Sequence, residues 1–198
     1  MLSGKEVMVV KRSMPNFGAT IRDRAALGFL GAPLGLSLPL MSAIAINSGN
    51  TIVQENDIHD PAYQIAEEIA ASMGIKYGTK YTGIGNVEIS GDDDDVSIVS
   101  AVYQSIPLAL DVKTIGWGLS YRIVTSNQYH VSFRVRLRLV NTESKDALVE
   151  GFCSYRTPAD ETTTYDQLVD NGAIRLKEEL TKGVRFCVQE FSSKYLLM

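Results

Sequence analysis

The most regular alternation of apolar and polar residues lies within residues 131–140. Apolar residues take every second position there, and serine or arginine takes the positions between them. A period of two is typical of a β-strand that buries one face and exposes the other. The pattern therefore predicts a strand with an apolar inner face and an arginine-bearing outer face. The inner residues are Val131, Phe133, Val135, Leu137 and Leu139, and the outer ones are Ser132, Arg134, Arg136 and Arg138.

A hairpin partner for this strand is predicted directly after it. Residues 141–146 are polar and typical of a turn, and residues 147–155 alternate again. This second alternation places Cys153 on the face that we expect to be buried. Two further strands are predicted, over residues 97–103 and 108–121.

Two helices frame these strands. Asp60 followed by Pro61 is typical of a helix start, because aspartate caps the first turn and proline is tolerated at its first position. Gly74 is a typical stop, so this helix is predicted over residues 61–73. The second helix is predicted over residues 165–195, from one continuous apolar stripe at steps of three or four. The stripe consists of Val169, Ala173, Leu176, Leu180, Val184, Cys187 and Phe191.

Together these elements predict an α+β fold. We expect an antiparallel sheet of three to five strands, with two helices packed on one face and the other face in water. The 198 residues are 45% hydrophobic, which is enough for one core, and we expect one domain over residues 51–198. Residues 1–50 are predicted to be an N-terminal arm that contains an apolar segment.

Cys153 and Cys187 are the only cysteines of the chain. Each lies on the apolar side of its own element, one on a strand and one on the long helix, so their sulfurs could meet in the core. We expect one disulfide bond between them, which would place the protein in an oxidising compartment. The alternative is two unpaired buried thiols, because cysteine also packs as a small hydrophobic residue.

The chain has no charged residue between residues 25 and 54. This stretch is long enough to reach across a bilayer, but its two prolines would remove helical hydrogen bonds that lipid does not replace. We expect a segment that is covered by protein, with membrane contact and a flexible arm as the alternatives. The residues predicted to make an assembly or membrane contact are Gly28, Gly31, Gly35, Leu36 and Leu38.

The outer arginines are a candidate binding surface. Arg134, Arg136 and Arg138 could bind an anionic ligand, such as a cell-wall fragment, or the carboxylates of a partner. The alternative is an ordinary solvated strand face, with salt bridges to neighbours such as Glu150. Trp117 lies between two glycines, which indicates a bulge or a close approach of backbones, and we also consider it a partner-contact residue. The net charge of -4 offers no general attraction to nucleic acid, and we expect no nucleic-acid partner.

Residues with catalytic or metal-binding chemistry are few. His59 and His130 are far apart in sequence and neither has a metal-ligand spacing, so we expect no metal site, no cofactor and no catalytic residue. The acidic run of residues 92–95 lacks the ligand pattern of a calcium loop and is predicted to be a solvated loop. We therefore expect a protein that is not an enzyme. The alternative is a hydrolase with an unfamiliar kind of active site.

Several short sequences resemble those of poorly characterised bacterial envelope lipoproteins. They are residues 56–61, residues 110–118, the alternating arginine and leucine strand, residues 150–153, and the final helix with Cys187. The likeness covers about residues 50–192. More distantly, the order of helix, strands and helix is similar to an α+β domain found in three kinds of protein: the outer-membrane lipoproteins that activate cell-wall synthases, the curli secretion lipoprotein and the N-terminal domain of the Tol translocation protein.

This resemblance implies a periplasm-facing accessory domain that is tethered to the outer membrane and works by protein contact. The lipid-bearing cysteine of such lipoproteins has no counterpart in this chain, so we expect the anchor to belong to a full-length precursor. We predict a non-enzymatic accessory or scaffold subunit of a secretion or envelope-spanning assembly. Its expected partners are other envelope proteins or further copies of itself.

Overall fold

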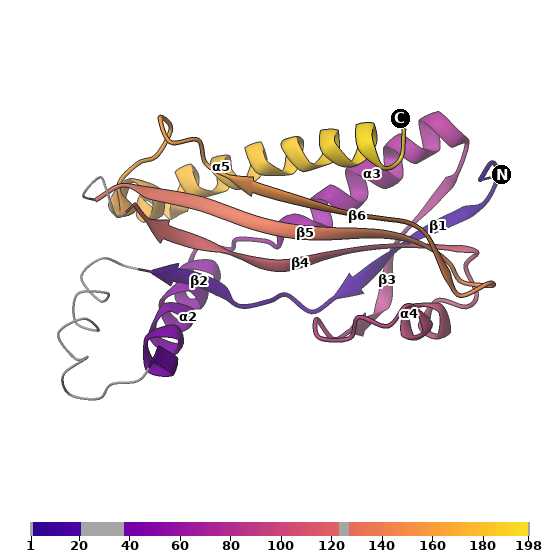
Figure 1. The fold of residues 1–198 in the computed structure, drawn as a ribbon, viewed down its shortest axis with the longest axis horizontal. Helices are drawn as coiled ribbons and strands as arrows, with labels where there is room; N and C mark the ends of the chain where they lie inside the picture. Colours follow the sequence, from indigo (N-terminus) through magenta and orange to yellow (C-terminus); the bar gives the residue numbers. More distant parts are fainter. Residues whose placement is uncertain (1, 21–37, 123–126, 198) are drawn as a thin grey trace.

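The structure, a computed structural model, contains a six-stranded sheet and four helices in its described residues (Figure 1). It describes residues 2–20, 38–122 and 127–197. The elements are β1 (Glu6–Arg12), β2 (Phe17–Thr20), α2 (Leu38–Glu55), α3 (Pro61–Tyr77), β3 (Lys80–Ile89), α4 (Val96–Val102), β4 (Leu108–Tyr121), β5 (Tyr129–Asn141), β6 (Asp146–Arg156) and α5 (Tyr165–Lys194). The fold class is α+β, as the sequence predicts.

The sheet is mixed rather than purely antiparallel, which corrects the expected architecture. Its order is β3-β1-β4-β5-β6, and β2 also pairs with β4. β1 runs parallel to both of its neighbours, whereas β4, β5 and β6 are antiparallel to one another. β1 and β2 come from residues 1–50, which the sequence assigns to an arm. The boundary at residue 50 therefore divides the sheet.

α3 and α5 cover one face of this sheet (Figure 1). They pack against each other, α3 also against β4 and α5 against β5 and β6. The inner residues of β5, such as Phe133, Val135 and Leu137, are buried there, as the alternation predicts. α2 adds Ile52 and Val53 to the same core. Removal of these apolar side chains from water is the main stabilising contribution to the fold.

α4 covers part of the opposite face. α4 includes residues 97–102, which belong to the strand predicted over residues 97–103. The prediction of a strand there is wrong. Asp95 caps the helix, because its carboxylate accepts a hydrogen bond from the Ser97 N–H at 2.8 Å. Val99 belongs to a second, smaller core between α4 and the sheet. The outer face is therefore partly covered, and not entirely in water as expected.

α3 begins where the sequence predicts and ends later. Asp60 caps its first turn by accepting a hydrogen bond from the Ala62 N–H at 2.9 Å. At the other end, the N–H of Gly78 donates to the carbonyl of Gly74, so Gly74 lies inside the helix and does not stop it. Gly78 has φ 68°, a left-handed conformation that glycine adopts without strain and that ends the helix.

α5 is interrupted near its start, which corrects the prediction of one continuous helix. Residues 170–173 have non-helical backbone angles, with φ 53° at Asn171 and φ 71° at Gly172. The apolar stripe nevertheless stays on the core side from Leu176 to Phe191. The stripe follows from side-chain spacing, whereas the break falls at Asn171 and Gly172, two residue types that adopt a positive φ more readily than others.

A disulfide bond joins β6 to α5. The Sγ atoms of Cys153 and Cys187 are bonded, and their Cα atoms are 5.6 Å apart. Both residues are buried, one on the inner face of its strand and one on the helix stripe. On the chain-entropy model a link that closes a loop of this length stabilises the fold by about 3–4 kcal/mol. It ties the last strand of the sheet to the long helix.

Candidate contact surface

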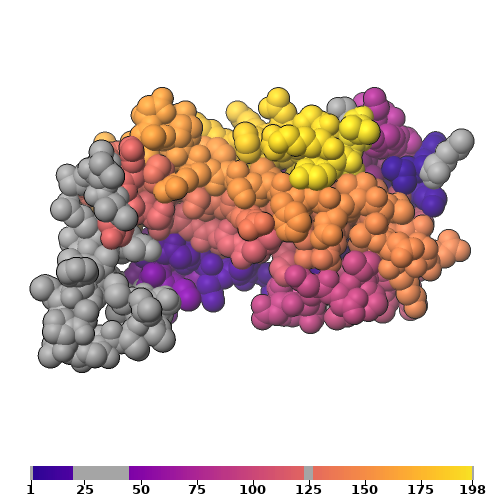
Figure 2. Space-filling model, viewed as in Figure 1, coloured from indigo at the N-terminus to yellow at the C-terminus, as the bar shows by residue number. Residues whose placement is uncertain are grey.

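The outer face of the sheet, on the side away from α3 and α5, has two parts. The part that we name the covered half lies beneath α4 and the loop of residues 90–95, and it contains Arg12, Asp111, Lys113, Arg136 and Arg138. The part that we name the open half is exposed or half-buried, and it contains Gly116, Ser132, Arg134, Phe152, Ser154 and Arg156. In Figure 2 the orange atoms of the β6 region reach the surface between the yellow α5 and the magenta α4.

Arg12 and Asp111 form a buried ion pair at the centre of the covered half. The Nε and Nη2 atoms of Arg12 donate to the two carboxylate oxygens of Asp111, each at 2.8 Å. Its Nη1 donates to the backbone carbonyls of Ser90 and Asp93 at 3.0 and 2.6 Å. Arg136 adds a longer contact to Asp111 at 3.4 Å. This bidentate pair fastens the loop of residues 90–95 to the sheet.

Arg136 and Arg138 are held by carboxylates and a carbonyl. The Nη1 of Arg136 lies 2.9 Å from Oδ1 of Asp94, and the Nζ of Lys113 donates to the same oxygen at 2.5 Å. Arg138 donates to the carboxylate of Glu150 at 2.8 Å and to the Asp94 carbonyl at 2.6 Å. The Lys113 hydrogen bond is the main reason why the pKa of Asp94 is lowered to about 2. Arg136 is only 3% exposed. Two of the three arginines proposed from sequence as a ligand ribbon are therefore occupied within the protein.

The acidic run of residues 92–95 belongs to this cluster and is not simply a solvated loop. The carbonyl of Asp93 and the carboxylate of Asp94 both accept from cations of the sheet, and Asp95 caps α4. The physical reason is attraction between the loop and the outward cations of β1, β4 and β5. In the part of the chain that the structure describes, no group of three His, Cys, Asp or Glu side chains could hold a metal ion.

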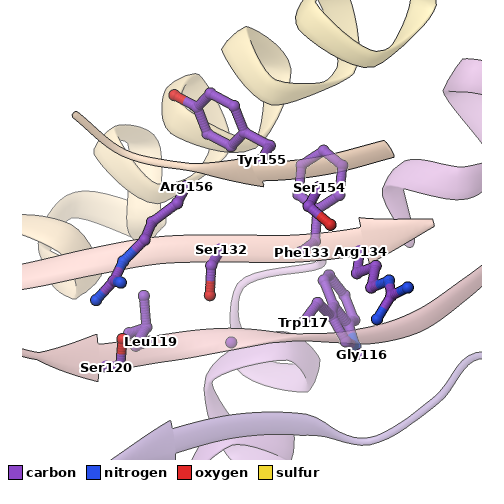
Figure 3. Close-up of a pocket in the computed structure, with 11 residues that line it drawn as sticks. Gly116, Trp117, Leu119, Ser120, Ser132, Phe133, Arg134, Ser154, Tyr155 and Arg156 are labelled. Carbon is purple, nitrogen blue, oxygen red and sulfur yellow. The ribbon is translucent and has the colours of Figure 1, made fainter. Parts of the chain in front are cut away.

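The open half surrounds a shallow concavity of about 440 Å³. Arg134 and Arg156 lie on either side of Ser132, and Gly116 leaves the floor free of a side chain (Figure 3). The guanidinium of Arg134 lies over the ring of Phe152, 5.3 Å from its centroid, which holds the arginine in place. Within the described ranges neither arginine has a carboxylate at ion-pair distance.

Trp117 is buried and belongs to the core of the protein. Its indole N–H donates to the carbonyl of Pro15 at 2.9 Å, and its ring meets Phe17 edge-on at 4.8 Å. The glycines beside it have the role that the sequence indicates. A bulge interrupts the pairing of β4 with β5 just before Gly116. A Cβ atom on Gly118 would lie 2.1 Å from a backbone oxygen of β2, so the two strands approach closely there.

The uncharged stretch of residues 25–54 is described only in its second part. Gly28, Gly31, Gly35 and Leu36 lie outside the described residues, and Leu38 is the first residue of α2. Towards its end, Gly49 packs so tightly on β2 that a Cβ atom there would lie 1.8 Å from the Phe17 carbonyl oxygen. No helix in the described ranges has the length and apolarity to cross a membrane.

A further buried carboxyl, Asp60, lies at the start of α3. Burial raises its pKa, although hydrogen bonds from the Thr114 hydroxyl and the Ala62 N–H act in the opposite direction. One of these hydrogen bonds comes from the first turn of α3 and the other from β4, and both end on Oδ1 of Asp60. Asp60 therefore fixes the helix to the sheet.

Sequence reasoning missed the partners of the arginines. Asp111 and Lys113 alternate with apolar residues on β4, which is the pattern that would have placed both on the outer face. Arg12 is the last residue of β1 and follows the apolar run of residues 7–10. A short apolar run of this kind is typical of a buried parallel strand. Arg156 follows Ser154 by two residues on β6, so both side chains face the same side of the sheet. The sequence analysis assigned Arg156 to no surface. In each case the local signal was present, and the missing information was which strands are neighbours.

Comparison with known proteins gives distant structural likeness only. No family model and no curated protein matches the chain. A PelC variant dodecamer from Paraburkholderia phytofirmans is 11% identical, with 96% of this chain and 89% of that chain covered and a TM-score of 0.42. The hypothetical protein CT253 from Chlamydia trachomatis is 7% identical, with 95% of each chain covered and a TM-score of 0.45. Lipoprotein GNA1162 from Neisseria meningitidis is 14% identical, with 94% of this chain and 99% of that chain covered and a TM-score of 0.32.

The chain is thus distantly similar to bacterial proteins that include a lipoprotein. At these identities and TM-scores, neither the assembly nor the activity of those proteins is carried over to it.

Proposed function

We propose that the protein is a non-enzymatic, periplasm-facing accessory or scaffold subunit that acts by protein-protein contact within a secretion or envelope-spanning assembly. The observation that carries this proposal is the open half of the sheet. Phe152 is 44% exposed on β6, and the guanidinium of Arg134 lies over its ring. Among the described residues, Arg134 has no carboxylate at ion-pair distance. Exposed apolar and arginine side chains on a strand are well suited to a protein partner.

The cellular location is inferred from the disulfide and from the sequence resemblance. A buried disulfide between two elements is expected in a compartment where cystines persist, such as the periplasm. The resemblance to envelope lipoproteins adds an outer-membrane anchor in the full-length precursor. The uncharged stretch of residues 25–54 would supply a further assembly or membrane contact.

A second candidate function is the binding of an anionic ligand, such as a cell-wall fragment. The observation that favours it is the placement of Arg134 and Arg156 on either side of Ser132 at the concavity. Arg136 and Arg138 would contribute to such a site only through their charge. This function requires salt-sensitive anion binding that is lost when Arg134 and Arg156 are both replaced by glutamine.

Site-specific photo-crosslinking in the bacterium that makes the protein tests the main proposal. A benzophenone amino acid would replace Phe152 in the open half, and Ile174 on α5 as the matched control, because Ile174 is also apolar and exposed. We expect protein adducts after illumination from position 152 and none from position 174. A folded, envelope-located variant that gives no adduct from position 152 would contradict the proposal.

A further inference from the structure

Three carboxylates are buried among the described residues, and only two of them have a cation beside them. Asp111 accepts two hydrogen bonds from the guanidinium of Arg12, each at 2.8 Å. The carboxylate of Glu179 lies 2.9 Å from the Nζ atom of Lys182. Asp60 is 4% exposed, and within the described ranges no lysine, arginine or histidine lies at ion-pair distance from it. A buried charge is normally paired, so Asp60 is the buried carboxylate that is suited to an external cation.

The hydrogen bonds to Asp60 all end on one of its two carboxylate oxygens. The Ala62 N–H and the Thr114 hydroxyl both donate to Oδ1, and no described residue donates to Oδ2. The N-terminus of α3 adds only a partial positive charge, equivalent to about half an elementary charge. Burial therefore raises the pKa of Asp60, because its ionised form is desolvated without a full counter-charge. A cation at Oδ2 would supply that charge.

Asp60 lines a concavity of about 460 Å³ that α2, α3 and the segment between β1 and β2 form together. This volume is in the range of small-molecule sites. The ring of Tyr63 also lines it, and the hydroxyl of Tyr63 donates to the Arg12 carbonyl and accepts from the Arg12 N–H, so the ring has a fixed position. The apolar part of the wall consists of Met14, Val53 and Ile58.

The charges around this concavity favour a cation. It has no lysine or arginine among its lining residues. Its one basic residue is His59, whose ring is 84% exposed and lies 3.8 Å from the carboxylate of Asp57. A second concavity, of about 340 Å³, lies on the other side of residues 57–60 and includes Lys177, which would repel a cation. The larger concavity is therefore the better cation site of the two.

We propose that the larger concavity binds an organic ammonium group on a short apolar stem, with the positive charge at Oδ2 of Asp60. The ammonium would hydrogen-bond to the carboxylate and lie close to the ring of Tyr63, and the stem would contact the apolar wall. A free alkylamine and a lysine side chain of a partner protein share this chemistry. The site is on the helix-covered side of the sheet, so it does not depend on the contact proposed for the open half.

The first test is a titration of the native protein with pentylammonium chloride at constant salt, followed by amide NMR. The Ala62 N–H donates to Asp60, so its signal reports on the carboxylate. We expect this signal to shift until it saturates. Pentanol has the same stem without the charge, and we expect it to leave the signal unchanged. No shift with pentylammonium, or an equal shift with pentanol, would overturn the proposal.

The second test removes the charge and keeps the helix cap. Asp60→Asn retains a capping oxygen, because asparagine caps helices as well as aspartate does. We expect its affinity for pentylammonium to fall about tenfold or more, with an unchanged circular dichroism spectrum. Asp57→Asn is the matched control, since it removes the same charge from the same loop but from a side chain that is 89% exposed. It should change the affinity less than about twofold. Equal losses in the two variants would indicate diffuse surface attraction and overturn the site.

A third titration distinguishes the two sources of the ammonium group. Its probe is a tripeptide with a central lysine, blocked at both ends, and its control is the same peptide with the lysine acetylated. Tighter binding of the lysine peptide than of pentylammonium would identify a lysine of a partner protein as the ligand. Binding of pentylammonium alone would identify a free amine. If the acetylated peptide bound as well as the unmodified one, the charge would not be recognised and the proposal would fail.

Discussion

Arg134 and Arg136 lie two residues apart on β5 and point to the same side of the sheet, but their surroundings differ. Arg136 is 3% exposed and contacts Asp94 and Asp111, whereas Arg134 is exposed and lies over Phe152. The difference arises because α4 and the loop of residues 90–95 cover only one half of the outer face. In the covered half the arginines form ion pairs within the fold, whereas in the open half Arg134 and Arg156 have no carboxylate at ion-pair distance among the described residues.

The largest expected effect comes from removing the carboxylate of the covered half. Asp111→Ala leaves the guanidinium of Arg12 buried with no counter-charge, and Arg136 loses one contact. Breaking a buried pair in this way costs about 3–5 kcal/mol, because the remaining charge is desolvated and unpaired. The measurement is the free energy of unfolding in urea. Glu150→Ala is the matched control, because it removes a carboxylate that is exposed, and a loss as large as that of Asp111→Ala would break the comparison.

A smaller effect is expected from acid. The hydrogen bond from Lys113 lowers the pKa of Asp94 to about 2, below its ordinary value of 3.8. The ionised carboxylate therefore stabilises the fold above pH 4, and this contribution is lost as the pH falls from about 4 towards 2. Because the Asp94 side chain is 59% exposed and screened by solvent, we expect less than about 1 kcal/mol. Unfolding free energies of the native chain and Asp94→Asn, measured between pH 5 and pH 2, should converge at the acid end. A constant difference would contradict this assignment.

The smallest effect is expected in the open half. Arg134→Gln removes a contact with an exposed ring and no ion pair, so stability should fall by less than about 0.5–1 kcal/mol. The thermal unfolding midpoint, compared with that of Arg136→Gln, measures the contrast directly. If the two glutamine variants lost equal stability, the open half would be part of the structural core and the comparison would fail.

The local elements were predictable to different degrees. The hairpin of β5 and β6 and the start of α3 depend on alternation and capping within a few residues, and the structure has them where the sequence places them. The strand predicted over residues 97–103 is a helix, because a short apolar run fits both periods and only the Asp95 cap distinguishes them. β1 was missed because its partners, β3 and β4, follow it at a long distance in the chain.

The sequence by itself determined which side of the sheet each β5 residue faces, because side-chain direction follows from a period of two along one strand. It also placed both cysteines on core-facing positions of their elements. Only the tertiary structure decided which arginines are engaged, because Asp94 and Asp111 reach Arg136 through a loop and a neighbouring strand. Ion pairing depends on distances between segments that are remote in the chain, and these distances are set when β1, α4 and the 90–95 loop pack onto the sheet.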